Sequence, residues 1–546
     1  MRIALLLAGS LLMGQDWPKT IFEQTEFKQT STVADVKTFM SALAKHTPGL
    51  KPYHPKGAPT TTETGKPLNA WRLAATGRDP LRVYLNGNIH AGEVEGKDAL
   101  QLVLRELAQG KHPQLRKALE IVTLPTYNAD GTDALDPRNR THQPNPAGGV
   151  GPRENAFGLD LNRDMMKAAS ANVQWLLAMY RDFDPSCIMD LHTTNGSYHG
   201  FHITHQASWG TGGDQGLSRF NRRMLVEVQE KLKGQGLPTY DYGNFRMDKD
   251  RKPVAWETDF ASPNLTSNYP VLEYRLGVLV ETYVYLGYPE RIEANRKFIL
   301  EVLAWLAEHK DEVKAQQQAA RTRWTEAWKQ GAPKLPLKAE PEETEKATID
   351  LVEPLRDENR RYLGEKNRTT LVLPSFVTYK DMDLVGVPTG YLVDPAYARR
   401  VRPMLEAHGL KVLPGSARPK GETILNFHET ERTISKGAYQ GVFTLQLKGS
   451  WKQEPLPKRA AYPWTNQDLD QALYVPVNQP LGRLAFYLLD PRSADGLVFW
   501  GIFHSSLIRG SGMWGDGPRA PIMAVGASAM EAPAGAPVKG NEKHED

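Results

Sequence analysis

The sequence predicts an α/β fold, in which helices cover both faces of a mainly parallel mixed sheet, followed by a β-rich accessory C-terminal domain. Two observations lead to this prediction. Apolar, β-prone runs alternate with amphipathic helices through about residue 315, which is the pattern of parallel strands joined by crossover helices. After that point, short β-like runs separated by turn residues predominate.

Each element of the first region has its own local signal. A helix is predicted at 30–49, where Thr and Ser residues offer N-caps and a Pro-Gly pair ends the helix. Further helices are predicted at 95–110, 172–183, 215–236 and 291–313, where apolar residues recur at helical spacing. Strands are predicted at 69–76, 81–89, 120–128, 186–194 and 275–285. In such sheets, functional residues gather where the strands end.

The composition divides the chain further. Residues 316–346 are rich in Lys, Glu, Gln, Ala and Pro and read as a charged helical and Pro-rich linker. The α/β domain therefore spans 15–315 and the accessory domain 347–528, with β-like runs at 369–379, 389–394, 423–434, 441–451 and 496–503 and a helix at 398–409. A disordered tail is expected at 529–546.

Residues 1–14 read as a signal peptide, because Arg2 precedes an apolar run from Ile3 to Met13 that is too short to span a bilayer. A buried N-terminal helix is the alternative. The single cysteine, Cys187, excludes an intramolecular disulfide. We therefore expect an exported protein, periplasmic or extracellular, that is not stably inserted in a membrane once the signal is removed.

The charge balance argues against a nucleic-acid partner. The 546 residues include 67 Lys and Arg and 63 Asp and Glu, a formal net charge of +4, whereas nucleic-acid binding calls for a basic patch. Apolar content of 40% and charged content of 24% are those of a globular protein. The 14 histidines are more informative, since imidazole is the commonest metal ligand.

The first candidate metal ligands lie in the stretch NGNIHAGEVEG, where a His is followed three residues later by a Glu. This spacing is not specific, because it occurs three times in the chain. The pairs are His90/Glu93, His309/Glu312 and His428/Glu431. Only His90 and Glu93 sit at a predicted strand-to-helix junction, which is the rim of a parallel sheet.

A catalytic zinc ion takes three protein ligands and keeps one position for water. His192, at the end of the predicted strand 186–194, is the best third ligand. Taken alone, it is better explained as a buried histidine with a structural partner. His199, His202 and His205 alternate in a strand-like way and are weaker alternatives.

Glu281 is a carboxylate within the apolar strand 275–285. Burying it is costly unless it is paired with a cation, lies near a metal or has a raised pKa. It is either the partner of a core arginine or a general base for a metal-activated water.

Two further motifs follow apolar segments. Asn162 and Arg163 lie in GLDLNRD, where the Arg fork suits two-point recognition of a carboxylate such as a peptide C-terminus. A surface ion pair is the plain alternative for the arginine. The YNADG stretch at 127–131 reads by itself only as a turn.

The order of these motifs resembles that of the zinc metallocarboxypeptidase family, the carboxypeptidase A-like peptidases. The order is strand-HxxE-helix, Asn-x-Asp-Gly, an Arg-containing loop, LNR, strand-His and strand-Glu. The resemblance covers roughly residues 20–313 and is greatest to a bacterial exported branch, through GLDLNRDMMK and DLHTTNG. It implies one Zn²⁺ ion held by His90, Glu93 and His192, with Glu281 as general base.

The resemblance also implies the substrate-binding groups. Asn162 and Arg163 would hold the terminal carboxylate of the substrate. The arginine that polarises the scissile carbonyl should lie in DPRNRTHQ, and Arg140 is preferred to Arg138. The family's mobile tyrosine has no secure counterpart; Tyr269 is the nearest match and Tyr274 the alternative.

These expectations describe a metallocarboxypeptidase that hydrolyses the C-terminal bond of peptides with a free carboxylate. A cell-wall peptide amidase or an amino-acid deacylase on the same fold is the runner-up. A non-catalytic binding protein is the third hypothesis, which a missing base or ligand would have favoured.

Overall fold

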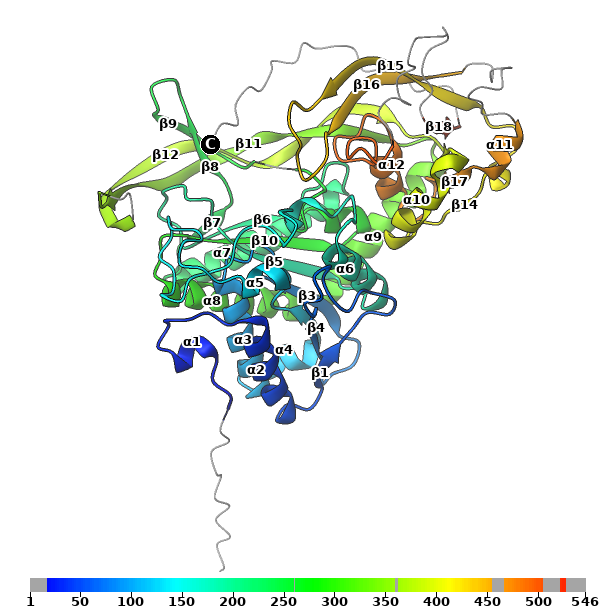
Figure 1. The fold of residues 1–546 in the computed structure, drawn as a ribbon. Coiled ribbons are helices and arrows are strands. Elements are labelled where there is room, and N and C mark those ends of the chain that lie inside the picture. Colours follow the sequence, from blue (N-terminus) through cyan, green and yellow to red (C-terminus); the bar gives the residue numbers. More distant parts are fainter. Residues whose placement is uncertain (1–16, 260, 359–361, 454–465, 504–520, 527–546) are drawn as a thin grey trace, which may run out of the picture.

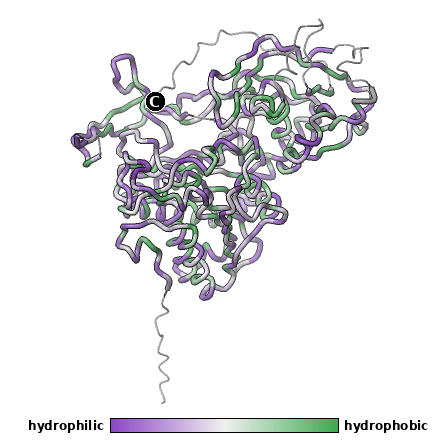
Figure 2. The backbone as a smooth tube through the Cα atoms, in the orientation of Figure 1, coloured by the Kyte–Doolittle hydropathy of each residue, from purple (hydrophilic) through white to green (hydrophobic). Residues whose placement is uncertain are grey.

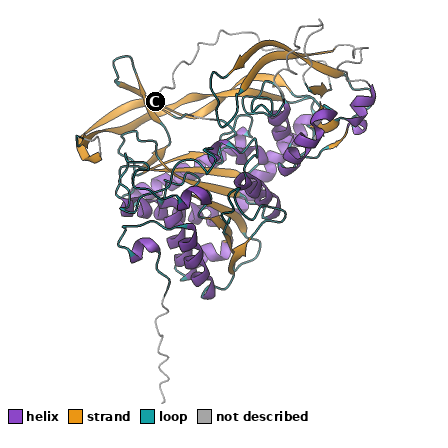
Figure 3. Ribbon diagram, viewed as in Figure 1, coloured by secondary structure: helices purple, strands orange, loops and turns teal. Residues whose placement is uncertain are grey.

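The computed structural model describes residues 17–259, 261–358, 362–453, 466–503 and 521–526 (Figure 1). The predicted signal peptide at 1–14 and the predicted tail at 529–546 lie outside these residues. Within the described ranges, the strands form an eight-stranded, a four-stranded and a six-stranded sheet. Figure 3 shows that helices surround the largest sheet, while the C-terminal half holds most of the remaining strands. The predicted α/β fold with a β-rich C-terminal region is confirmed.

The eight-stranded sheet has the order β1-β2-β4-β3-β5-β10-β6-β7. Its central pairs, β4 with β3, β3 with β5 and β5 with β10, are parallel, whereas β1 with β2, β2 with β4 and β6 with β10 are antiparallel. Its strands are β1 (Leu50–Tyr53), β2 (Ala70–Leu73), β3 (Leu81–Gly87), β4 (Leu119–Leu124), β5 (Cys187–Thr193), β6 (Ile203–Ala207), β7 (Thr239–Asp241) and β10 (Leu276–Thr282).

Helices cover both faces of this sheet. Tyr84 of β3 packs on one face against Trp175 of α6, with ring centroids 6.2 Å apart. On the other face, Gly87 lies directly against Leu100 of α3. The helices of this half are α1 (Ile21–Gln24), α2 (Val33–Lys45), α3 (Glu95–Ala108), α4 (Pro113–Ala118), α5 (Ala129–Asp133), α6 (Ala171–Asp182), α7 (Gln215–Gly234), α8 (Tyr288–Glu308) and α9 (Lys310–Lys329).

The central strands are buried on both faces, which explains their nearly continuous apolar sequences. Every residue of β4 and β5 is buried, and in β10 only Glu281 is partly exposed. The hydropathy colouring in Figure 2 shows polar chain concentrated in the outer segments. The order β4-β3-β5 reverses direction at β3, so the carboxyl ends of β3 and β5 flank the crevice in which open α/β sheets bind ligands.

The segment 316–346, which the sequence predicts to be a charged helical and Pro-rich linker, is helical in its first part and a strand in its second. Residues 316–329 belong to α9, and 334–346 form the first part of β11 (Lys334–Arg356), which pairs with β12 (Tyr362–Gly386) in a long antiparallel hairpin. β11 lies at the edge of its sheet, where Pro336 and Pro341 are tolerated because an edge strand leaves one side of its backbone unpaired. Figure 1 shows this hairpin running along the C-terminal half.

The hairpin also ties the two halves together. β12 pairs in parallel with β9 (Pro253–Glu257), which pairs with β8 (Asn244–Met247) of the first half. A single buried apolar cluster continues from Phe22 near the start of the described chain to Ala524 near its end. The two regions therefore share a core.

The six-stranded sheet has the order β14-β17-β13-β18-β15-β16. Its elements are β13 (Gly390–Val393), α10 (Pro395–Ala407), β14 (Leu413–Pro414), β15 (Ile424–Ile434), β16 (Leu445–Gln453), α11 (Asn466–Gln471), β17 (Leu473–Pro476), α12 (Gly482–Leu489) and β18 (Ile522–Val525). The predicted helix at 398–409 is confirmed as part of α10.

Two local predictions differ from the structure. Residues 496–503 form turns rather than a strand, because buried side chains such as Val498 and Trp500 satisfy an apolar pattern without strand pairing. The predicted helix at 291–313 is divided at His309 into α8 and α9. Among the described residues, no helix has the length and apolar character needed to cross a membrane.

Candidate active site

The candidate ligands and the candidate base come from three neighbouring parallel strands. His90 and Glu93 lie in the turn between β3 and α3, whereas His192 lies in β5 and Glu281 in β10. In the parallel pairing of β5 with β10, His192 and Glu281 are direct partners. Residues opposite one another in a ladder point to the same face of the sheet, so this register places both side chains on one side.

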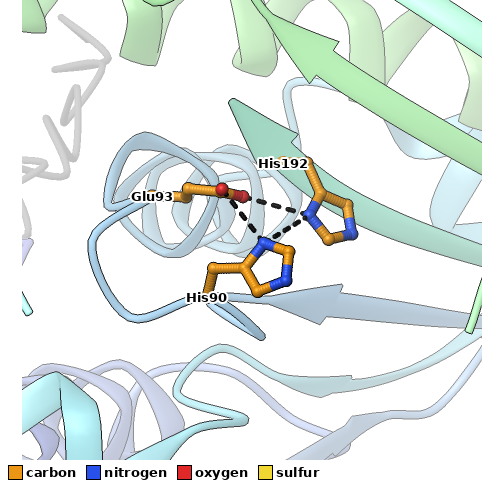
Figure 4. Close-up of side chains that lie close together, drawn as sticks. All are labelled: His90, Glu93 and His192. Atoms are coloured by element: carbon orange, nitrogen blue, oxygen red, sulfur yellow. Dashed lines mark hydrogen bonds and ion pairs between the residues drawn. The ribbon is translucent and has the colours of Figure 1, made fainter. Parts of the chain in front are cut away.

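His90, Glu93 and His192 form one compact buried cluster, shown in Figure 4. Nδ1 of His90 lies 3.0 Å from Oε1 of Glu93, and Nδ1 of His192 lies 3.0 Å from Oε2 of the same carboxylate. The two Nδ1 atoms are 3.3 Å apart. All three side chains offer a ligand atom within 4.8 Å of one another.

The outer nitrogen of each histidine faces a carboxylate. Nε2 of His90 lies 3.1 Å from Oδ1 of Asp160, and Nε2 of His192 lies 2.8 Å from Oδ2 of Asp190. A neutral imidazole that donates from Nε2 to a carboxylate presents the lone pair of Nδ1 on its other side. This is the arrangement that orients metal-bound histidines in proteins.

The donor set fits a divalent metal ion such as zinc. With both Nε2 atoms donating outward, two imidazole lone pairs and a carboxylate converge on the same small space. Three acceptors this close repel one another unless a cation lies between them. Two histidines and one glutamate are also a ligand set that catalytic zinc uses, with a further position left for water.

The protonation behaviour of the cluster agrees with a metal site. Burial would raise the pKa of Glu93, but the charges of His90 and Arg140 hold it well below its usual range. Burial would lower the pKa of His192, but Asp190 and Glu93 raise it well above its usual range. Both shifts have the same origin, which is the attraction between a carboxylate and the cationic side chains beside it.

Glu281 is in a different state from Glu93. Burial raises its pKa to about 8, with the charge of His192 opposing this rise and that of Glu93 adding to it. Its Oε2 is buried and makes no hydrogen bond within the described part of the chain. A carboxylate oxygen without a hydrogen-bond partner beside the ligand cluster suits a general base, and a bound cation would lower the pKa of Glu281.

The cluster opens into a pocket of about 320 Å³. Asn162 and Arg163, in the short helical turn η1 (Leu161–Arg163), line this pocket together with the ligands and Glu281. The side chain of Asn162 accepts a hydrogen bond from the backbone N–H of Thr266 at 2.8 Å, which fixes its orientation. The structure therefore brings the predicted carboxylate-binding pair to the predicted metal ligands.

Residues 36–182 match the zinc carboxypeptidase family. This segment contains the HxxE pair, His90 and Glu93, and after it the LNR motif. Residues of both motifs line the pocket. Residues 36–182 belong to a zinc carboxypeptidase domain. The match ends before β5 and β10, so the structure, rather than the match, connects His192 and Glu281 to the site of this domain.

Similarity to curated proteins is confined to part of the chain. Carboxypeptidase 2 of Trichophyton rubrum is 26% identical over 163 residues, which cover 28% of this chain and 27% of that protein. Carboxypeptidase 2 of Trichophyton tonsurans is 27% identical over 114 residues, covering 20% and 18% respectively. The chain thus matches only 27% and 18% of the length of these two curated relatives.

Two solved structures show a partial likeness. The metallo-carboxypeptidase from Burkholderia cenocepacia has a TM-score of 0.39 at 15% identity, over 51% of this chain and 70% of that one. The metallo-carboxypeptidase from Pseudomonas aeruginosa has a TM-score of 0.36 at 17% identity, over 51% and 69%.

Of the two arginines that the sequence offered for polarising the scissile carbonyl, only Arg140 lines the pocket. Arg140 lines the pocket of the zinc carboxypeptidase domain, and its Nη1 donates to Oε1 of Glu93 at 3.0 Å. Arg138 is largely exposed and pairs with Asp136. The side chain of Arg140 passes so close to Gly92 that a Cβ there would collide with it, which explains the glycine in the HAGE stretch.

Sequence reasoning missed a third arginine. Arg153 lines the same pocket and donates from Nε and Nη2 to Oδ2 of Asp160, at 3.1 and 2.8 Å. Its Nη1 lies 3.4 Å from Nδ1 of His90. The available signal was its place in GPRENAFGLDLNRD, nine residues before Asn162, in the segment that leads directly to η1.

Neither of the two tyrosines that the sequence suggested for substrate binding lines the pocket. Tyr269 does not line the pocket; it is fully buried, and its hydroxyl contacts Glu273 at 3.0 Å and His408 at 2.6 Å. Tyr274 is also buried away from the pocket. Tyr242, which the sequence did not single out, does line it. It follows β7 in an unremarkable loop, so no local signal marked it.

The three other histidines do not join the cluster. His199 is buried among the rings of Tyr283 and Trp256, and His205 contacts Gln229 at 3.2 Å. Burial lowers the pKa of all three, including His202. They are structural side chains of β6 and the loop before it.

Tyr269→Phe tests whether this tyrosine serves structure or substrate. Removing the hydroxyl leaves Glu273 and His408 with one buried partner fewer, so the free energy of unfolding should fall by about 1–3 kcal/mol. Peptide affinity should stay unchanged. Urea denaturation and KM measurements check both effects; a raised KM at unchanged stability would restore a substrate role for Tyr269.

Proposed function

We propose that the protein is a zinc-dependent carboxypeptidase that removes the C-terminal residue of peptides with a free carboxylate. The observation that carries this proposal is the position of Glu281, beside three converging ligands and in one pocket with Asn162 and Arg163. The membership of residues 36–182 in the zinc carboxypeptidase family supports it.

His90, Glu93 and His192 would hold the ion, which supplies Lewis acidity toward water and the scissile carbonyl when bound. Glu281 then acts on the attacking water. Its raised pKa and buried, unpartnered Oε2 suit a group that accepts a proton from water and passes it to the leaving amine. Its place in a strand of the central sheet keeps the carboxylate fixed toward the pocket.

Arg163 and Asn162 would hold the end of the substrate. Nη1 of Arg163 donates to the backbone carbonyl of Asn162 at 2.9 Å, which ties the guanidinium to η1. The charged fork pairs with a carboxylate at two points, which a neutral amide cannot match. The distance between this pair and the ligands then determines which peptide bond lies at Glu281, and this selects the last one.

Arg140 and Arg153 support different parts of the reaction. Nη1 of Arg140 is committed to Glu93 and its Nε to Gln143, so this arginine chiefly orients a ligand. Arg153 is held from behind by Asp160 and directs Nη1 toward the cluster. We assign to Arg153 the larger share in stabilising the developing oxyanion, in place of the Arg140 that the sequence favoured.

Glu281→Gln is the first test of the mechanism. It keeps the shape of the side chain and removes the base, so kcat should fall about 10²- to 10⁴-fold while zinc content stays at the wild-type level. His192→Ala is the matched variant and should lose zinc, as measured by atomic absorption. Undiminished hydrolysis by zinc-loaded Glu281→Gln protein would refute the role of Glu281.

A pair of peptides that differ only at the C-terminus tests the substrate class. The free acid should be shortened by one residue and its amide should resist cleavage, because the amide lacks the charge that Arg163 binds. Mass spectrometry of the products decides between the outcomes. Equal cleavage of both peptides would instead favour an endopeptidase or an amidase on the same fold.

Lysine substitutions separate the two pocket arginines. Arg153→Lys keeps the charge but loses the fork, so kcat should fall about 10²-fold or more with zinc content maintained. Arg140→Lys should mainly weaken zinc affinity through Glu93. If kcat responds to Arg140→Lys and not to Arg153→Lys, Arg140 rather than Arg153 stabilises the oxyanion.

A further inference from the structure

A tight turn of the C-terminal half reaches the substrate-binding end of the site. Nε of Arg163 donates to the hydroxyl of Tyr439 at 3.1 Å. One residue further along, the side-chain oxygen of Gln440 accepts from the backbone N–H of Asp160 at 2.8 Å. Adjacent residues of one turn therefore contact the predicted carboxylate-binding arginine and the residue whose carboxylate faces the metal ligand His90.

The local geometry of the turn is well defined. Tyr439 and Val442 exchange two backbone hydrogen bonds, at 2.8 and 3.1 Å. The two residues between them, Gln440 and Gly441, have φ angles of 50° and 76°. Two successive left-handed residues make a two-residue hairpin turn of the type that favours Asn-Gly. A glutamine at the first position is unusual there and costs conformational energy.

The strained backbone of Gln440 allows its side chain to make a contact with the active-site pocket region. Its side chain reaches Asp160, which in turn accepts from Arg153 and from the N–H of Asn162 and faces Nε2 of His90. A glycine would fit the turn without strain but could not make this contact. Glutamine is therefore better explained by what it binds than by the turn itself.

The turn is supported from behind by the core. The ring of Tyr439 stacks on Trp500, with centroids 5.8 Å apart, and Trp500 is 1% exposed. The ammonium group of Lys167, from the first half, lies 4.3 Å from the centroid of the same indole ring. The hydroxyl of Tyr439 is thus held at a fixed place relative to Arg163.

We propose that the turn 439–442 is a positioning element of the carboxylate-binding end, through which the C-terminal half sets the affinity for the substrate's terminal carboxylate. This inference rests on the proposed function. Tyr439 holds Nε while the carbonyl of Asn162 holds Nη1, so the plane of the guanidinium is fixed from two sides. A fork fixed in advance binds a carboxylate with less loss of side-chain entropy.

The test measures binding as well as turnover. Zinc-loaded protein is titrated calorimetrically with N-acetyl-phenylalanine, N-acetyl-lysine and N-acetyl-glutamate and with the C-terminal amide of each. Tyr439→Phe removes one hydrogen bond that orients the Arg163 guanidinium. Among the acids that the wild-type protein binds, we expect the affinity of this variant to be about 3- to 10-fold lower, with little change for the amides. In turnover assays, KM should rise by a similar factor, with kcat within about twofold of wild type.

Gln440→Gly provides a second, independent variant. It should relieve the left-handed strain, so the melting temperature should stay constant or rise, while acid affinity falls about threefold. A merely structural residue would not combine these two effects. Tyr391→Phe is the matched control, since it removes a hydroxyl that lies 3.1 Å from Asp490 in the same half, without touching the site; it should lower stability and leave affinity unchanged.

The outcomes separate this inference from the proposed function. Wild-type protein that binds the acids but hydrolyses no peptide would contradict the proposed function, while the variants would still decide the role of the turn. Unchanged acid affinity in both turn variants would overturn the inference. So would an equal loss for acids and amides, an equal loss in Tyr391→Phe, or a wild-type protein that does not distinguish acids from amides.

Discussion

The pairing register between β5 and β10 is the constraint on which the site depends. It sets His192 directly opposite Glu281, so the candidate base lies beside the candidate ligands without any loop having to carry it there. A slip of one residue would turn Glu281 to the other face of the sheet. The burial of β5 throughout and of β10 at every residue but Glu281 makes such a slip costly. Hydrophobic burial thus stabilises the geometry of a polar site, and Glu281, the one partly exposed residue of β10, lines the pocket.

The sequence could predict which side chains lie together at the pocket where their place follows from the ends of buried strands. His90, Glu93, His192 and Glu281 were singled out in this way and lie in one pocket, although the HxxE spacing alone occurs three times. Arg153 and Tyr242 could not be found, because they reach the pocket from loops whose paths depend on contacts distant in sequence. The position of Tyr269 outside the pocket has a similar cause: its partner His408 lies 139 residues away, and nothing near Tyr269 in the sequence marks its hydroxyl as already engaged.

The C-terminal half illustrates the same limit on a larger scale. A segment with the composition of a linker forms β11, because its stability comes from pairing along the whole of β12 rather than from local preference. β12 then continues the sheet of β8 and β9, and Tyr379 on β12 contacts Gln206, which lines the pocket, at 3.0 Å. The second half therefore contacts the pocket region at two separate places, through Tyr379 and through the turn 439–442. It is structurally integrated with the first half, as the shared apolar core also requires.

Asp160 contacts residues of both halves at the edge of the pocket. Burial would raise its pKa, but His90 and Arg153 hold it well below the usual range, so it stays ionised and accepts several hydrogen bonds at once. Its two oxygens face His90, Arg153 and the N–H of Asn162, while its own N–H donates to Gln440. A displacement of this one side chain would therefore disturb the candidate ligand His90, the pocket residue Arg153 and the turn η1 together. Because Gln440 accepts from the backbone N–H of Asp160, the candidate ligand His90 and the predicted carboxylate-binding pair in η1 are linked through a contact that the C-terminal half supplies.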